Sequence, residues 1–272
     1  PPSALLLGLW PAFALFALIV LVAVLGPALA PYDPMESNAA RALQPPNWDH
    51  WFGTDNLGRD VFSRVLVATR LDLMISVAAV ALSFVIGAAL GSVAGYWGGW
   101  IDALTGRLVD TIMAFPLFVL AMGIVAAMGN TVENIIYATA IINLPFYARV
   151  ARAEVRIRRD AGFAQAARLS GNTDLQVLAF HIFPNALPPM MVQISLNMGW
   201  AILNAAGLSF IGLGVRPPTA EWGIMVAEGA NFVVSGEWWL AVFPGLALMI
   251  AVFAFNLLGD GLRDIFDPRQ RT

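Results

Sequence analysis

Long apolar runs alternate with short polar segments along almost the whole chain. Six runs approach the roughly 20 apolar residues that a helix needs to cross a bilayer. The fourth run is the shortest and contains Asn143 and Pro145, so its limits are the least well defined. The pattern predicts an all-α integral membrane protein with six transmembrane helices. The predicted spans are Leu5–Leu29, Leu73–Ala94, Val109–Met128, Ile135–Tyr147, Leu187–Leu213 and Trp239–Leu258.

A cleavable signal peptide is the alternative for the first span, because Ala28-Leu29-Ala30 resembles a cleavage site. The apolar run exceeds the usual h-region of about 7–15 residues and no basic residue precedes it, which favours a retained span. The chain begins at Pro1 and not at a methionine, so a preceding cytoplasmic segment stays open. The predicted parts are a first transmembrane helix (1–30), an extracytoplasmic segment (31–70) and a core of five helices (71–272). The core includes a cytoplasmic loop (151–186) and an outer segment (214–238).

Composition supports the membrane assignment. Hydrophobic residues make up 59% of 272 positions and charged residues only 12%, against about 25% in a typical soluble domain. The net charge of −3 gives no indication of nucleic-acid binding, and the absence of cysteine excludes disulfides and thiolate chemistry. The basic residues are all arginines. A P-loop needs a lysine, so this chain has no P-loop of its own for ATP.

The arginines predict the orientation. With a cytoplasmic N-terminus, ten arginines fall on inner segments and five on outer segments, which favours N-in and C-in. The inner ones are Arg107, Arg149, Arg152, Arg156, Arg158, Arg159, Arg168, Arg263, Arg269 and Arg271; the outer ones are Arg41, Arg59, Arg64, Arg70 and Arg216. Membrane-lipid phosphates are the expected partners of most of the inner arginines.

Three glycines repeat at every fourth residue of the second span, at Gly87, Gly91 and Gly95. On a helix this spacing places them on nearly one face, where a neighbouring backbone can approach closely. The alternative is that glycines are simply common in membrane helices. We favour a helix-packing role.

Uncharged amides are the main polar groups within the predicted spans. Asn143, Gln193, Asn197 and Asn204 are candidates for lining a pathway, although hydrogen bonding between helices is the commoner use of such groups. No acidic or basic side chain is expected deep in a span, which argues against an ion-coupled carrier, since such carriers use buried ionisable groups.

Catalysis is not expected on this chain. An intramembrane aspartyl protease would place Tyr32-Asp33 and Gly259-Asp260 at membrane depth, where neither is predicted. The two histidines, His50 and His181, lie in predicted extramembrane regions without metal-ligand spacing, so neither a serine-protease site nor a metal site is indicated.

A polar island, Phe163–Pro189, interrupts the apolar runs. The stretch Ala161–Ser170, which begins two residues before the island, favours a helix. Gly171 suits a helix end with positive φ. Thr173-Asp174-Leu175-Gln176 matches a capping box that starts a second short helix, and the prolines at 184, 188 and 189 are expected to end it. The pattern predicts a docking element for a soluble motor. An amphipathic helix resting on the membrane surface is the alternative.

Several motifs resemble a known family. Gln165-Ala166-Ala167, Gly171 and Ile182–Pro188 are similar to the EAA loop of ABC importer permeases. Segments His50–Asp60, Gly95–Trp100, Ala206–Gly214 and Phe255–Asp264 extend the resemblance over nearly the whole chain, specifically to the C-type subunit of the dipeptide/oligopeptide/nickel group. Gln165 stands where the family has the glutamate that names the loop, so a salt bridge from that position to the ATPase is in doubt.

The resemblance implies a type I ABC importer permease. Its partners would be a homologous second permease subunit, two cytoplasmic P-loop ATPase subunits that hold ATP and Mg²⁺, and an extracytoplasmic substrate-binding protein; no cofactor is expected on this chain. Short peptides are the expected substrate, with nickel chelates or glutathione-like compounds as alternatives, and a non-transport membrane scaffold is the competing class. The residues implied in ATPase coupling are Ala161, Ala164, Gln165, Ala166, Ala167, Gly171, Asp174 and Pro184. Those implied in docking the binding protein are Asp55, Asn56, Arg59 and Asp60.

Overall fold

The structure, a computed structural model, describes residues 2–266; Arg269 and Arg271, counted above as inner arginines, lie outside them. Within that range the chain is helical, with one isolated β-bridge between Thr54 and Asp60. Its helices are α1 (Pro2–Leu29), η1 (Ala39–Arg41), α2 (Val61–Trp97), α3 (Gly99–Met113), α4 (Leu117–Met128), α5 (Val132–Arg158), α6 (Gly162–Leu169), α7 (Asp174–Gln176), η2 (Val177–Ile182), α8 (Phe183–Phe210), α9 (Trp222–Ala230) and α10 (Trp239–Phe266).

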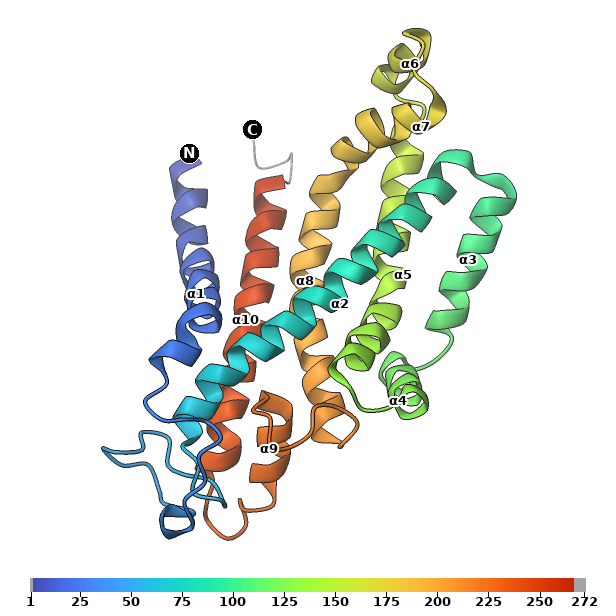
Figure 1. The fold of residues 1–272 in the computed structure, drawn as a ribbon. Coiled ribbons are helices and arrows are strands. Elements are labelled where there is room, and N and C mark those ends of the chain that lie inside the picture. Colours follow the sequence, from blue (N-terminus) through green and yellow to red (C-terminus); the bar gives the residue numbers. More distant parts are fainter. Residues whose placement is uncertain (1, 267–272) are drawn as a thin grey trace.

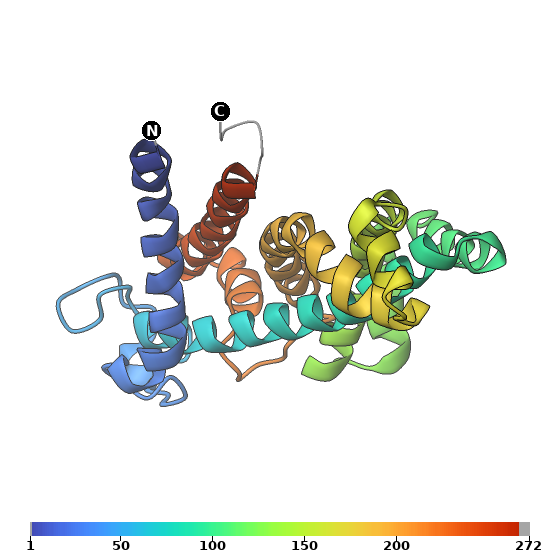
Figure 2. The ribbon, with the colours of Figure 1, turned by 90° about the horizontal axis from the view of Figure 1, so that it is seen from above.

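Long helices stand side by side, and the polar segments gather at the two ends (Figure 1). α6 and α7 project from one end, whereas α9 and the segment between α1 and α2 cover the other. Figure 2 shows α2 running across the row formed by α1, α10, α8 and α5. The largest apolar cluster forms where these helices meet near the end that carries α9, around Trp222, Trp239 and Phe255.

Four helical stretches are long and apolar enough to cross a membrane, and the bent pair α3–α4 makes five within residues 2–266. α5 has 27 residues, about 40 Å, which suffices to cross a bilayer. It is absent from the apolar set because polar and charged residues are spread along it. The count of six spans and the N-in, C-in orientation therefore stay predictions.

The third predicted span is wrong as a single helix. α3 and α4 meet at an angle of 87°. Pro116 precedes α4, and a proline lacks the N–H for a helical hydrogen bond while disfavouring the helical conformation of Phe115 before it. α5 begins before the fourth predicted span and continues past its end at Tyr147 to Arg158, so the helix is longer than the predicted span.

The expectation that the prolines end a second short helix is wrong as well. α7, η2 and α8 form one unbroken helical stretch, Asp174–Phe210, with Pro188 and Pro189 inside it. η2 is π-helical, and the N–H of Phe183 donates to the carbonyl of Leu178, five residues back. This wider register accommodates the following Pro184, which has no N–H of its own to donate.

Charged side chains lie on α2 and α3 at or outside the edges of the predicted spans, so the expectation of none deep in a span stays a prediction. Asp72 in α2 is buried and accepts a hydrogen bond from the backbone N–H of Trp222 at 3.1 Å. α3 carries Asp102, Arg107 and Asp110. Asp102 pairs with Arg152 and Asp110 pairs with Arg149, whereas Arg107 is exposed.

The glycines of α2 face α5. A Cβ atom built on Gly91 would lie 2.2 Å from the carbonyl oxygen of Ala148, and on Gly87 2.7 Å from that of Leu144. On Gly95 it would lie 2.5 Å from the carbonyl oxygen of Arg152. The two helix backbones are therefore in direct contact over more than two turns.

Candidate coupling site

The projecting helix α6 is anchored through its small residues. Ala164 and Ala167 are buried in a cluster with Val155, Val177 and Ile182. The opposite face carries Gln165 and Ala166, which are exposed, and the Gln165 side chain donates to the carbonyl of Asp160 at 2.9 Å. The helix thus has one face fixed to the protein and another open to a partner.

The tip of α6 is apolar and exposed. Leu169 is 90% exposed, and Phe163 is also exposed one turn and a half earlier. Ser170 caps the helix and Gly171 follows with φ of +87°, a conformation that favours glycine. Exposed large apolar side chains on a polar surface segment are typical of an interaction site.

The segment after Gly171 is fixed by the capping box. The Thr173 hydroxyl accepts a hydrogen bond from the N–H of Gln176, and the Gln176 side chain accepts one from the N–H of Thr173. Asp174 lies in the first turn, where a negative charge interacts favourably with the helix N-terminus. Pro184 lies on the exposed side at the start of α8.

A tyrosine at the end of α2 joins α6 to α7. The Tyr96 hydroxyl donates to Asp174 at 2.6 Å and accepts from Arg168 at 3.2 Å. The guanidinium of Arg168 lies 5.5 Å from the centre of the Tyr96 ring and also donates to the carbonyl of Arg159 at 3.0 Å. The hydrogen bond to Tyr96 raises the pKa of Arg168 above its usual value. Sequence analysis gave Tyr96 no role, although a tyrosine ending an apolar helix is a signal for a hydroxyl that needs a partner.

Replacing Tyr96 by phenylalanine is expected to loosen α6 without unfolding the protein. The ring would remain packed, while Arg168 and Asp174 would lose their shared hydroxyl, at a cost of about 1 kcal/mol. We expect amide hydrogen exchange in residues 161–171 to accelerate roughly five-fold. Tyr137→Phe, at an exposed tyrosine of α5, is the matched control. Equal exchange in the two variants would show that Tyr96 does not hold α6.

The predicted docking residues of the extracytoplasmic segment (31–70) are mostly internal. Asp55, Arg59 and Asp60 are buried, whereas Asn56 is exposed. The Arg59 side chain donates a hydrogen bond to the Asp55 carboxylate at 2.6 Å. The Asp60 carboxylate pairs with His50 at 2.8 Å and also caps the first turn of α2. Their docking role stays a prediction, and burial leaves Asn56 as the one of the four that could touch a partner directly.

The predicted pathway amides are largely inside the chain. Asn143, Asn197 and Asn204 are buried and Gln193 is half-buried. Asn143 and Asn204 each donate to the backbone carbonyl four residues earlier, and Gln193 donates to Asn197 at 2.9 Å. These bonds satisfy the amides only in part, because Asn143 Oδ1 and Asn197 Nδ2 are buried without a hydrogen-bond partner within residues 2–266, and a role in lining a pathway stays a prediction. The described residues contain no group of three or more His, Asp or Glu that could hold a metal.

Comparison with known proteins decides the family. The binding-protein-dependent transport system inner membrane component matches residues 87–272, and the N-terminal transmembrane domain of oligopeptide transport permease C matches residues 10–46. The chain belongs to the binding-protein-dependent transport permeases. The sequence resemblance is thereby confirmed, and the permease is a membrane component of an ABC importer.

Curated relatives cover most of the permease. It is 43% identical over 255 residues to the probable D,D-dipeptide transport system permease protein DdpC of Escherichia coli, covering 94% of this chain and 85% of that protein. The dipeptide permease DppC of Alkalihalophilus pseudofirmus is 41% identical, with 93% and 83% covered. The glutathione permease GsiD of Escherichia coli O1:K1 is 43% identical, with 94% and 85% covered.

Solved structures support the fold. A chain of the MetNI methionine ABC transporter, solved in inward-facing conformations, matches with a TM-score of 0.60 at 17% identity, covering 75% of the permease and 97% of that chain. At this identity the likeness concerns the fold alone. It agrees with the predicted type I ABC importer permease fold, and the scaffold alternative is not favoured.

Proposed function

We propose that this chain is the permease subunit of an ATP-driven importer of short peptides, forming half of the passage beside a homologous second permease. The relatives named for dipeptides and peptides support this substrate class. Glutathione, the substrate named for other relatives, is itself a small peptide-like compound. The observation that carries the coupling role is α6, a projecting helix with an anchored alanine face and an exposed apolar tip.

Energy would come from two partner ATPase subunits, which would hold ATP and Mg²⁺ and grip α6 of each permease. Closure of the ATPases on ATP would displace α6 and α7. Two routes lead from there into the membrane: Tyr96 passes the motion to α2, and η2 passes it to α8 without an intervening loop. Opening would expose the passage to the binding protein, and hydrolysis would return it to the inward-facing state.

The binding protein would dock on the outer surface formed by residues 31–60 and α9. Trp48 is 95% exposed there, and Leu57 beside Asn56 is also exposed. The buried pairs Asp55–Arg59 and His50–Asp60 would keep this surface in a fixed shape. A preformed surface lowers the entropic cost of docking.

Replacing Gly171 by valine is expected to uncouple the importer. A Cβ atom at this position meets nothing within 4 Å, so the effect would come from φ of +87°, which a β-branched residue resists strongly. The turn would open by adopting another conformation and displace the tip of α6. We expect transport-coupled ATPase activity to fall at least about ten-fold while membrane insertion persists.

Gly162→Ala is the matched control, because Gly162 also has open space but no positive φ. Both variants would be compared by binding-protein-stimulated ATPase activity and peptide uptake in proteoliposomes. Normal coupling in Gly171→Val would refute the assignment of α6 as the coupling element.

Co-purification tests the proposal as a whole. The tagged chain would be expressed with its genomic neighbours, extracted in mild detergent and examined for stoichiometric partners. A second permease and P-loop ATPases are expected, with a co-encoded binding protein that binds short peptides. Recovery of the chain alone, or with unrelated partners, would return the scaffold as the better interpretation.

A further inference from the structure

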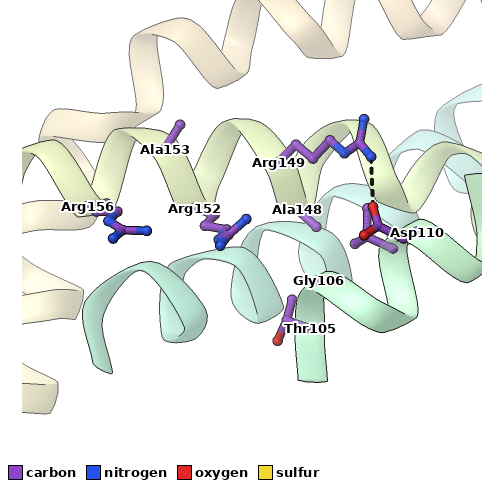
Figure 3. Close-up of a pocket in the computed structure, with 9 residues that line it drawn as sticks. Thr105, Gly106, Asp110, Ala148, Arg149, Arg152, Ala153 and Arg156 are labelled. Carbon is purple, nitrogen blue, oxygen red and sulfur yellow. Dashed lines mark hydrogen bonds and ion pairs between the residues drawn. The ribbon is translucent and has the colours of Figure 1, made fainter. Parts of the chain in front are cut away.

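Charged residues line a groove between α3 and α5 (Figure 3). Thr105, Gly106, Val109 and Asp110 of α3 face Ala148, Arg149, Arg152, Ala153 and Arg156 of α5 around a cavity of about 530 Å³. The three arginines follow one another along α5, and Arg149 reaches down to Asp110 (Figure 3). A volume of this size is ordinary for a small-molecule site.

The depth of the groove argues against lipid as its neighbour. Trp97 and Trp100 are exposed at the turn between α2 and α3, as residues of an interfacial aromatic belt are. Asp110 lies ten residues beyond Trp100, about 15 Å further along α3. Its side chain is 70% exposed in this chain, and that of its partner Arg149 is 52% exposed. A charged pair facing acyl chains at that depth would be unfavourable, so this face borders water or protein.

The break between α3 and α4 lies directly beyond the groove. α3 ends at Met113, one turn after Asp110, and the chain then turns by 87° into α4. Non-helical backbone at membrane depth is tolerated where it is buried in protein or lines a water-filled cavity. The groove and the break therefore lie in a part of the permease that water or protein, and not acyl chains, is expected to border.

The Arg149–Asp110 pair in the groove is largely exposed, whereas Asp102, just outside the groove lining, is mostly buried and pairs closely with Arg152. A guanidinium nitrogen of Arg149 lies 3.1 Å from a carboxylate oxygen of Asp110. Arg152 donates a hydrogen bond to Asp102 at 2.6 Å, and a guanidinium nitrogen of Arg156 lies 3.8 Å from the same carboxylate. Partly exposed ion pairs contribute little to stability, so a ligand can exchange with them at small cost. With three arginines and two carboxylates, the cluster also carries one excess positive charge.

We propose that this groove binds the two end charges of a short peptide during its passage. The inference rests on the proposed function. Arginine is suited to bind the terminal carboxylate through two parallel hydrogen bonds, and Asp110 would accept the terminal ammonium group. Successive pairs along α5 lie about one helical turn, 5 Å, apart, and an extended dipeptide spans about 7 Å. A phospholipid headgroup without an ammonium group fits less well, since its phosphate would leave Asp110 facing a like charge.

The absence of cysteine in the chain permits a direct test. Gly106→Cys would place one thiol in the groove, where a Cβ atom meets nothing within 4 Å. The complete complex with its partner permease and ATPases would be placed in nanodiscs and treated with a charged, membrane-impermeant maleimide, and labelling of this chain would be followed by mass spectrometry. We expect the thiol to react, because the groove is open to water.

Alanyl-alanine is the probe. At ten times its Kd it should slow labelling roughly ten-fold, since about one tenth of the sites remain free. Its C-terminal amide should protect much less. In the Gly106→Cys background, Arg149→Gln should raise the concentration for half-protection about ten-fold, and Asp110→Asn should do so as well. Arg107→Gln, an exposed arginine of the same helix outside the groove, should leave protection unchanged.

Three outcomes would overturn the inference: an unreactive thiol, which means that lipid or the second permease fills the groove; labelling without protection; or equal protection by the amide. Uptake of alanyl-alanine by the same Gly106→Cys complex with its binding protein distinguishes failure of the groove proposal from failure of the proposed function. Uptake without protection would reject only the groove, whereas a functional transporter that moves another solute and not the dipeptide would reject the proposed substrate class.

Discussion

Gly91→Leu is expected to prevent the permease from folding. Even a methyl group at this position would lie 2.2 Å from the carbonyl oxygen of Ala148, and the obstacle is backbone that cannot rotate away. Overpacking by a single methyl group costs about 1–3 kcal/mol, and a leucine would force α2 and α5 apart along their whole contact. We expect little monodisperse protein after detergent extraction and a lowered Tm for the milder Gly91→Ala.

Gly123→Ala provides the control for Gly91→Ala. Gly123 lies in α4, where an added Cβ atom meets nothing within 4 Å. Alanine also favours the helix more than glycine does, so this variant should be as stable as the parent or slightly more so. If Gly91→Ala and Gly123→Ala behaved alike in thermal unfolding, the close α2–α5 contact would not exist as described.

Arg64→Met is expected to detach the segment of residues 31–60 from the rest of the protein. Arg64 is buried in the second turn of α2, where its guanidinium donates to the carbonyls of Pro34 at 3.0 Å and Pro218 at 3.2 Å. It also lies 3.8 Å from Asp55. Methionine would fill the space but leave these acceptors buried without a donor, at a cost of about 3–5 kcal/mol. We expect rapid proteolysis within residues 31–60 and loss of stimulation by the binding protein, while basal ATPase activity persists.

Arg70→Met removes the same charge from the same helix at an exposed position. It should leave both proteolysis and stimulation close to those of the parent. If residues 31–60 remained resistant to proteolysis in Arg64→Met, the apolar contacts of Trp239 and its neighbours would hold this segment without the arginine.

Local rules predicted the coupling segment well. The helix around Ala164, the turn at Gly171 and the capping box at Thr173 follow from residue preferences that act over four or five positions. The same holds for the glycine spacing in α2. Each of these features depends on neighbours in sequence, so a single sequence contains the information.

Features that depend on distant contacts were not predicted. Tyr96 and Asp174 are 78 residues apart, and Arg64 and Pro218 are 154 apart. Apolar periodicity carries no information about such pairs. The break at Pro116 did have a local signal, but hydropathy averaging concealed it. The charges of α3 lie before or at the start of the third predicted span, so the sequence argument against ion-coupled transport stays a prediction, which family membership supports.

α2 ties both ends of the permease together. It has 37 residues, about 55 Å, with the polar contacts of Tyr96 at one end and those of Arg64 near the other. A rigid rod of this length turns a tilt of about 5° into a displacement of about 5 Å at its far end. Small rotations that α6 and α7 impose on the Tyr96 end of α2 would therefore become larger displacements at the Arg64 end. The stroke of the transporter would then be set by the length of a helix and by where its glycines fix the fulcrum on α5, rather than by how far any loop can stretch.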